Sequence, residues 1–222
     1  MKQIPLAILP ETAPRFETFT VGPNAAAVQH LRSLEAVAAP VYLWGPSGSG
    51  KTHLLRALAH ERQQQGHRVG WFDARSDVPW PVDEGWSLVI LDDCQDFDAL
   101  RQQAAFTVFV EAATSAVQVV AAGRVPPVDL PVRDDLRTRL GWGHIFALQP
   151  LGEAEVRAAL RREADRRGIF LSDDVMDYLL TRFARDLKHL MRLLDRLDHF
   201  ALSQHRGVTV PLLKSMLAEE GV

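Results

Sequence analysis

Up to Pro150, short apolar runs alternate with stretches of helical periodicity along this chain. Apolar runs of strand length occur at 41–44, 68–74, 87–93, 116–123 and 144–149. Between them, apolar residues recur at helical spacing over 25–38, 51–65, 98–113 and 133–140. We expect Asn24 to cap the first of these helices. Strands that alternate with helices predict a mainly parallel sheet with right-handed crossovers.

After Pro150 the pattern is helical only. Helical spacing continues through 152–167, 172–183, 185–203 and 210–219. The sequence therefore predicts an extended arm over 1–15, an α/β domain with a five-stranded parallel sheet over 16–150, and a small all-helical domain over 151–222. Basic residues are dense in this last part, but acidic residues are interleaved with them, as Glu163 is with Arg167 one helical turn away. This pattern favours a solvated, ion-paired face over a DNA-binding surface.

Composition narrows the class of protein. The 222 residues are 47% hydrophobic and 24% charged, with a net charge of −3, which is typical of a globular chain and lacks a strongly basic footprint for nucleic acid. The single cysteine, Cys94, excludes an internal disulfide framework and fits a reducing compartment. No apolar stretch approaches the roughly 18 to 20 residues that span a bilayer, and the N-terminus lacks a signal-peptide pattern. We expect a cytoplasmic protein with no membrane partner.

A phosphate-binding loop carries the strongest chemical signal. GPSGSGKT matches G-x-x-x-x-G-K-[ST] between a predicted strand and a predicted helix. Its glycines permit backbone angles that turn successive N–H groups toward phosphate oxygens, Lys51 supplies a cation, and Thr52 supplies a Mg²⁺ ligand. We expect ADP or ATP with Mg²⁺ to bind at Gly45, Pro46, Ser47, Gly48, Ser49, Gly50, Lys51 and Thr52. The bland alternative is a glycine-rich turn with an accidental lysine, which the strand–helix context disfavours.

Two carboxylates follow the predicted strand SLVILDD. Asp92 is placed to hold Mg²⁺ directly or through water, and Asp93 is placed to polarise an attacking water. The alternative is that one of the two only caps the following turn.

Three further features have two interpretations from the residues alone. Arg139, at the end of RDDLRTRL, either reaches a neighbour's γ-phosphate or makes a surface salt bridge. Arg185 either contacts phosphate or sits in the first turn of a helix. The apolar segment QIPLAI either packs onto the body of the protein or enters a partner's groove, and by itself it favours packing.

With these residues assembled, the chain resembles the DnaA family of replication initiators, across essentially its whole length. It is most similar to the short Hda branch, which inactivates the initiator. The resemblance rests on RFETFTVGPNAAAV, LWGPSGSGKTHLL, LVILDDCQDF, LRTRLGWGHIFALQPL and RFARDLKHLMRLLDRL. QIPLAI also resembles the Q-L-x-L-x-L motif that binds the sliding clamp.

The resemblance implies an AAA+ fold with a helical lid. It implies that Arg139 is an arginine finger acting in trans and that Arg185 is the sensor 2 arginine. It also implies that the clamp-binding residues are Gln3, Ile4, Leu6 and Ile8. The partners would be initiator DnaA, the DNA polymerase III sliding clamp, DNA through the clamp, and further copies of this chain. The protein would be bacterial, cytoplasmic and nucleoid-associated through the clamp.

One departure concerns hydrolysis by the chain itself. The initiator has a polar residue at the end of the fourth strand, whereas this strand ends in AAGR, with Ala122 or Gly123 in that region. Either the chain hydrolyses ATP weakly and works with ADP bound, or the alignment slips in this loop. Two other functions stay open: a helicase loader of the DnaC type, and a stand-alone ATPase with vigorous turnover.

Overall fold

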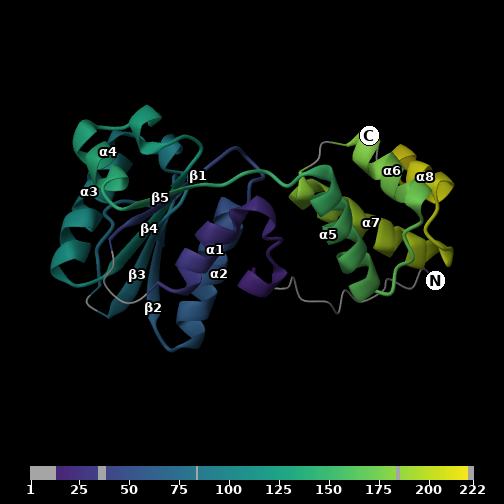
Figure 1. Ribbon diagram of the computed structural model, residues 1–222, viewed down its shortest axis with the longest axis horizontal. Helices are drawn as coiled ribbons and strands as arrows, with labels where there is room; N and C mark the ends of the chain where they lie inside the picture. The colour runs from purple at the N-terminus through teal and green to yellow at the C-terminus, as the bar shows by residue number, and fades with distance from the viewer. Residues whose placement is uncertain (1–13, 35–38, 84, 184–185, 220–222) are drawn as a thin grey trace. The chain divides into compact units, whose positions relative to one another are not determined.

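The structure is a computed structural model that describes residues 14–34, 39–83, 85–183 and 186–219 (Figure 1). The chain divides between Pro150 and Leu151 into two compact units. The first unit contains a five-stranded sheet and the second contains helices. The predicted fold class, an α/β domain followed by a helical domain, is confirmed.

The sheet of the first unit is entirely parallel. Its order, from one edge to the other, is β2 (Arg68–Phe72), β3 (Trp86–Leu91), β4 (Gln118–Gly123), β1 (Val41–Trp44) and β5 (His144–Ala147). Because the strands are parallel, the loops that follow β1, β3 and β4 emerge at one edge of the sheet. The loops that carry the predicted chemistry are therefore neighbours.

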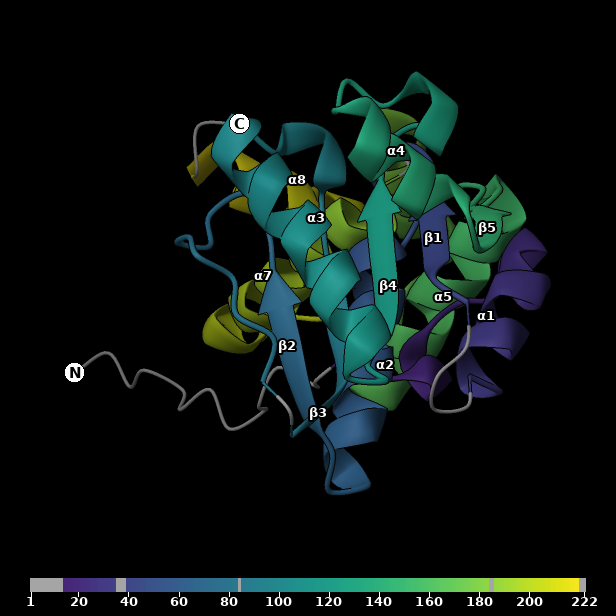
Figure 2. The ribbon, with the colours of Figure 1, turned by 90° about the vertical axis from the view of Figure 1, so that its left-hand side faces the viewer.

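Helices cover both faces of this sheet, and Figure 2 shows α3 in front of it and α2 behind it. The helices α1 (Ala25–Arg32) and α2 (Lys51–Gln64) pack on the face to which Val41 and Leu43 point. The helices α3 (Ala99–Thr114) and α4 (Asp134–Gly141) pack on the face to which Tyr42 points. Short 3₁₀ turns occur at Phe16–Thr18 (η1), Gly22–Asn24 (η2), Cys94–Asp96 (η3) and Pro127–Asp129 (η4). The central strands are buried on both faces, which explains their nearly continuous apolar sequences.

The first helix differs from its prediction at both ends. It ends at Arg32, although its apolar spacing continues to residue 38. Asn24 precedes the helix but does not cap it with its side chain. Instead, Asn24 Nδ2 donates to the carbonyl of Gln149 at 3.0 Å, and Asn24 Oδ1 accepts the Gln149 N–H at 2.8 Å. The buried amide thus ties the start of α1 to the chain that leaves β5.

The second unit has its own apolar core, formed between α5 (Glu153–Arg166), α6 (Asp173–Arg182), α7 (Leu187–Gln204) and α8 (Val210–Glu219). The third of these helices begins at Leu187, with Asp186 accepting the Lys188 N–H at 3.1 Å, and not at residue 185 as predicted. Among the described residues, no helix combines the length and apolar character needed to cross a membrane.

Ion pairs join the helices of the second unit. The expected contact between Glu163 and Arg167 is present, with an N–O distance of 2.5 Å. Arg167 also reaches Asp195 on α7. Arg157 pairs with Asp177 on α6. The interleaved charges therefore connect helices as well as covering a solvated face.

The Asn24 contact predicts a defined loss of stability. Asn24→Ala leaves the backbone N–H and C=O of Gln149 without this partner and should lower the free energy of unfolding by about 1 to 3 kcal/mol. Gln149→Ala is the matched control and should have little effect, because both bonds go to the Gln149 backbone. Urea denaturation of the two variants measures the difference. Equal stabilities would contradict this role.

Candidate nucleotide site

The phosphate-binding loop connects β1 to α2, as predicted, and its glycines adopt backbone angles that other residues rarely adopt. Gly48 and Gly50 have φ angles of 80° and 95°. A Cβ at Gly50 would also lie 2.6 Å from Phe19 Cε2, so this segment packs directly over the loop. Phe16 is buried in the core beneath α1 and α2. The spacing of the two phenylalanines therefore lets one fill the core while the other covers the loop.

Lys51 is the first residue of α2, and only 6% of it is exposed. Its Nζ donates to the carbonyls of Gly45 at 2.7 Å and Pro46 at 2.9 Å. Burial lowers the pKa of the Lys51 ammonium, against the opposite influence of the Asp93 and Asp92 carboxylates. A buried ammonium held by two neutral carbonyls would be stabilised further by an anion.

Asp92 follows β3 and reaches across to α2. Its Oδ2 accepts the Thr52 hydroxyl at 2.8 Å, and its Oδ1 accepts the Asp93 N–H at 3.0 Å. Only 4% of Asp92 is exposed, and burial raises the pKa of its carboxyl while the Thr52 hydrogen bond lowers it. The structure thus brings together the two side chains predicted to share a Mg²⁺ ion.

Asp93 has a left-handed backbone conformation, with φ of 54°, although it is not glycine. It precedes η3 but does not cap it with its side chain. Its Oδ1 accepts from Gln95 Nε2 at 3.1 Å, and Gln95 Oε1 accepts the Arg124 N–H at 3.0 Å. Gln95 therefore links the end of β3 to the end of β4. The sequence analysis missed this residue, and its place two residues after the acidic pair is the only local signal.

The end of β4 carries a second feature that sequence reasoning did not resolve. A Cβ at Gly123 would lie 2.0 Å from the Tyr42 hydroxyl, which donates to the carbonyl of Val125 at 3.0 Å. The space that a side chain at position 123 would need is thus taken by Tyr42. The next residue, Arg124, is near enough to Lys51 to lower its pKa and pairs with Asp96 at 3.3 Å.

These residues fit a nucleotide phosphate with Mg²⁺. Ser49 Oγ is buried without a hydrogen-bond partner in the part of the chain that the structure describes, and it faces Gly45 across the phosphate-binding loop. Thr52 and Asp92 offer two oxygens to a cation that prefers oxygen ligands. Phosphate oxygens would supply both the missing acceptor and further metal ligands.

Arg139 lies in the last turn of α4. Two other arginines of this segment are committed to neighbours: Arg137 pairs with Asp134 at 2.5 Å, and Arg133 pairs with Asp135 at 2.6 Å. Arg139 is half-buried and makes no ion pair or side-chain hydrogen bond within the described ranges. The salt-bridge interpretation therefore has no support among these residues.

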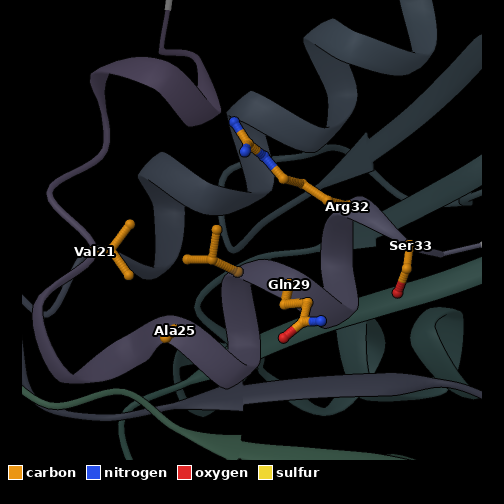
Figure 3. A pocket seen from close by; sticks show the side chains of 6 residues that line it. Val21, Ala25, Gln29, Arg32 and Ser33 are labelled. Carbon is orange, nitrogen blue, oxygen red and sulfur yellow. The ribbon is translucent and has the colours of Figure 1, made fainter.

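Five predicted site residues lie outside the described residues. They are Gln3, Ile4, Leu6, Ile8 and Arg185. A hollow of about 450 Å³ on the surface beside α1 (Figure 3) contains none of the predicted residues and is lined by Val21, Ala25, Val28, Gln29, Arg32 and Ser33. Arg32 is paired there with Glu17 at 2.9 Å, so its charge is already balanced.

Two family models match different parts of the chain. Residues 11–76 match the bacterial DnaA ATPase domain. Residues 153–217 match the Hda lid domain, which accounts for nearly the whole helical unit. The unit boundary at Pro150 lies between the two matches.

Solved structures share the fold. Domain III of the Thermotoga maritima replication initiation protein DnaA is similar with a TM-score of 0.76 and 20% identity, over 92% of this chain and 95% of that one. AMPPCP-bound DnaA from Aquifex aeolicus is similar with a TM-score of 0.69 and 22% identity, over 83% of this chain and 65% of that one. The Thermotoga maritima RuvB branch migration motor is similar with a TM-score of 0.62 and 17% identity, over 82% of this chain and 62% of that one. At these identities the likeness establishes the fold alone.

The contact at the end of β4 can be tested with a double-mutant cycle. Gly123→Ala should lower the free energy of unfolding by about 1 to 3 kcal/mol, because the new methyl group would overlap the Tyr42 hydroxyl. Tyr42→Phe removes that oxygen and should recover part of the loss, since the nearest remaining ring atom is 3.1 Å away. Urea denaturation of the two single variants and the double variant measures the coupling. Costs that simply add would show that the two residues do not compete for space.

Proposed function

Because this chain joins a segment of the bacterial DnaA ATPase-domain family to an Hda lid domain, we propose that it is an Hda-type negative regulator of replication initiation. With the DNA-loaded sliding clamp, it promotes hydrolysis of the ATP bound to initiator DnaA. The observation that carries this proposal is the lid match over 153–217, because the ATPase segment alone would also fit an initiator.

The chain itself binds ADP or ATP with Mg²⁺ at the end of β1. The loop N–H groups and Lys51 hold the phosphates, and Thr52 and Asp92 hold the metal. When bound, the phosphates would supply negative charge to Lys51, and Mg²⁺ would supply positive charge to Asp92. The chain's own ATP hydrolysis is weak, because it lacks the polar residue that the initiator has at the end of the fourth strand. The Tyr42 hydroxyl fills the space that a side chain at Gly123 would need. Arg185 contacts the nucleotide from the lid, and Asp93 orients water for whatever turnover occurs.

Arg139 acts on the nucleotide of another chain. Gly143, which follows α4, packs against the Pro40 carbonyl at the start of β1. The phosphate-binding loop follows the opposite end of β1, so the C-terminal end of α4 and the chain's own loop lie at opposite ends of this strand. Arg139 lies in the last turn of α4, one helical turn before Trp142. An unpaired guanidinium in this position is available to an external anion, and a planar fork suits phosphoryl oxygens. This arrangement supports action in trans on ATP-bound DnaA.

The remaining partners follow from the N-terminal segment. Gln3, Ile4, Leu6 and Ile8 bind the DNA polymerase III sliding clamp, with the apolar side chains in a groove and the glutamine at its rim. DNA is contacted indirectly through the clamp, and the chain assembles with further copies of itself as AAA+ modules do. The protein acts in the bacterial cytoplasm, at the nucleoid.

Loss of the P-loop lysine tests nucleotide binding. Lys51→Ala removes the ammonium that would meet the phosphates and should weaken ADP binding strongly, by about tenfold or more, since a charge-assisted contact contributes about 1.5 to 3 kcal/mol. Isothermal titration calorimetry with ADP and Mg²⁺ measures the change. Thr114→Ala is the control, because Thr114 is exposed at the C-terminal end of α3 and its hydroxyl donates to the Glu111 carbonyl of the same helix at 2.8 Å. Unchanged ADP affinity in Lys51→Ala would remove the P-loop assignment.

Loss of Arg139 tests the regulatory reaction. The chain is mixed with clamp, DNA and ATP-bound DnaA, and initiator ATP turnover is measured. Arg139→Ala should abolish most of the stimulation, because a positioned arginine is worth about 10³ to 10⁵ in rate. Arg139→Lys should fail nearly as badly, because an ammonium lacks the planar fork. ADP binding by either variant should be normal.

The same assay contains its own controls. A chain without residues 1–8 should fold and bind ADP but lose the clamp-dependent part of the stimulation. Arg133→Ala removes an arginine of the same segment that is already paired, and it should stimulate almost normally. Near-normal stimulation by Arg139→Ala would exclude the residue from the reaction.

A further inference from the structure

One tryptophan of this chain is exposed beside Arg139. Trp142 is 71% exposed, whereas Trp44, Trp71, Trp80 and Trp86 pack against the apolar cores of the α/β unit. An indole left in water on a folded domain is unusual, and at protein interfaces tryptophan is enriched among the residues that contribute most to affinity. Its exposure is therefore the feature that needs an explanation.

Trp142 shares its side of α4 with Arg139, which has no ion-pair partner among the described residues. The Trp142 N–H donates to the Arg139 carbonyl at 3.4 Å, so the two residues are one helical turn apart and neighbours on the helix surface. The 3₁₀ turn η4 packs against the same helix and carries Val128, which is 74% exposed. Both Figure 1 and Figure 2 show α4 at the margin of the α/β unit.

The backbone on both sides of Trp142 is held firmly. A Cβ at Gly141 would touch Pro127 at 3.6 Å, and a Cβ at Gly143 would lie 1.9 Å from the Pro40 carbonyl oxygen. The His144 N–H donates to that same oxygen at 2.8 Å. The indole is thus presented from a fixed point, which lowers the entropy cost of docking it into a partner.

We propose that Trp142, with Val128, is the apolar anchor that docks this chain onto a second, ATP-bound AAA+ chain and sets the position of Arg139. This inference rests on the proposed function and names the surface through which it works. Charge selects the occupant: the guanidinium beside the anchor has no carboxylate partner among the described residues, so it fits a surface that presents phosphate. Trp142 supplies affinity, and Arg139 supplies rate.

Separate kinetic signatures test this division. Initiator ATP turnover is measured against initiator concentration, with clamp and DNA present. Trp142→Ala should raise the half-saturating initiator concentration by about tenfold or more and leave the plateau rate within about twofold of wild type. Arg139→Ala should lower the plateau rate. Trp142→Phe should lie between Trp142→Ala and wild type in half-saturation.

Phe170→Ala is the matched control, because Phe170 is an aromatic side chain of the helical unit that is 83% exposed. It should leave half-saturation unchanged. Thermal unfolding and ADP affinity of Trp142→Ala should match wild type, since the removed side chain lies in solvent. Self-association of this chain, measured by sedimentation, distinguishes the initiator from a second copy of the chain as the occupant.

Each outcome decides one of the two proposals. If wild type stimulates and Arg139→Ala does not, but Trp142→Ala has normal half-saturation, the anchor is wrong and the proposed function stands. A Trp142→Ala defect confined to self-association, or one equalled by Phe170→Ala, also overturns the anchor. If wild-type protein gives no stimulation at all, the proposed function fails and this inference fails with it.

Discussion

Burial of the central strands on both faces is the constraint from which the rest of the α/β unit follows. β1, β3 and β4 carry apolar side chains in both directions, so helices must cover both sides of the sheet. Parallel strands with helical crossovers satisfy that requirement and send every strand toward the same edge. The loops after β1, β3 and β4 are therefore brought together before any catalytic requirement applies. The nucleotide site is a consequence of how this sheet is buried.

At that edge, two charged side chains are buried, and hydrogen bonds offset part of the cost of removing them from water. Lys51 is held by two loop carbonyls, and Asp92 is held by the Thr52 hydroxyl and a backbone N–H. Each group still pays for desolvation, as the lowered pKa of Lys51 and the raised pKa of Asp92 indicate. A phosphate with its metal would relieve both costs at once. Ligand binding and stability of this edge are therefore coupled through the same side chains.

The helix α4 shows how one segment can separate structural from functional arginines. Arg133 and Arg137 are bound to carboxylates of their own helix and to neighbouring groups, which fixes the segment against α3 and the preceding loop. Arg139 has no such partner in the part of the chain that the structure describes, and it lies next to an exposed indole. The paired arginines already have carboxylate partners, whereas Arg139 is available to a second molecule. The spacing of these arginines in the sequence does not distinguish the paired ones from Arg139.

The sequence by itself determined the order of strands and helices, the phosphate-binding loop, the acidic pair after β3 and the change to helices after Pro150, because each is a local pattern of periodicity or spacing. It placed the end of α1 too late, because apolar spacing continues past Arg32, and it placed the start of α7 before the Asp186 cap. Only the tertiary structure decided that Asn24 binds Gln149, a contact between residues 125 positions apart, and that Tyr42 fills the space beside Gly123. It alone decided which arginine of α4 has no partner among the described residues. These outcomes depend on which side chains meet when distant segments pack, and a contact between residues far apart in the chain leaves no periodic signal in the sequence.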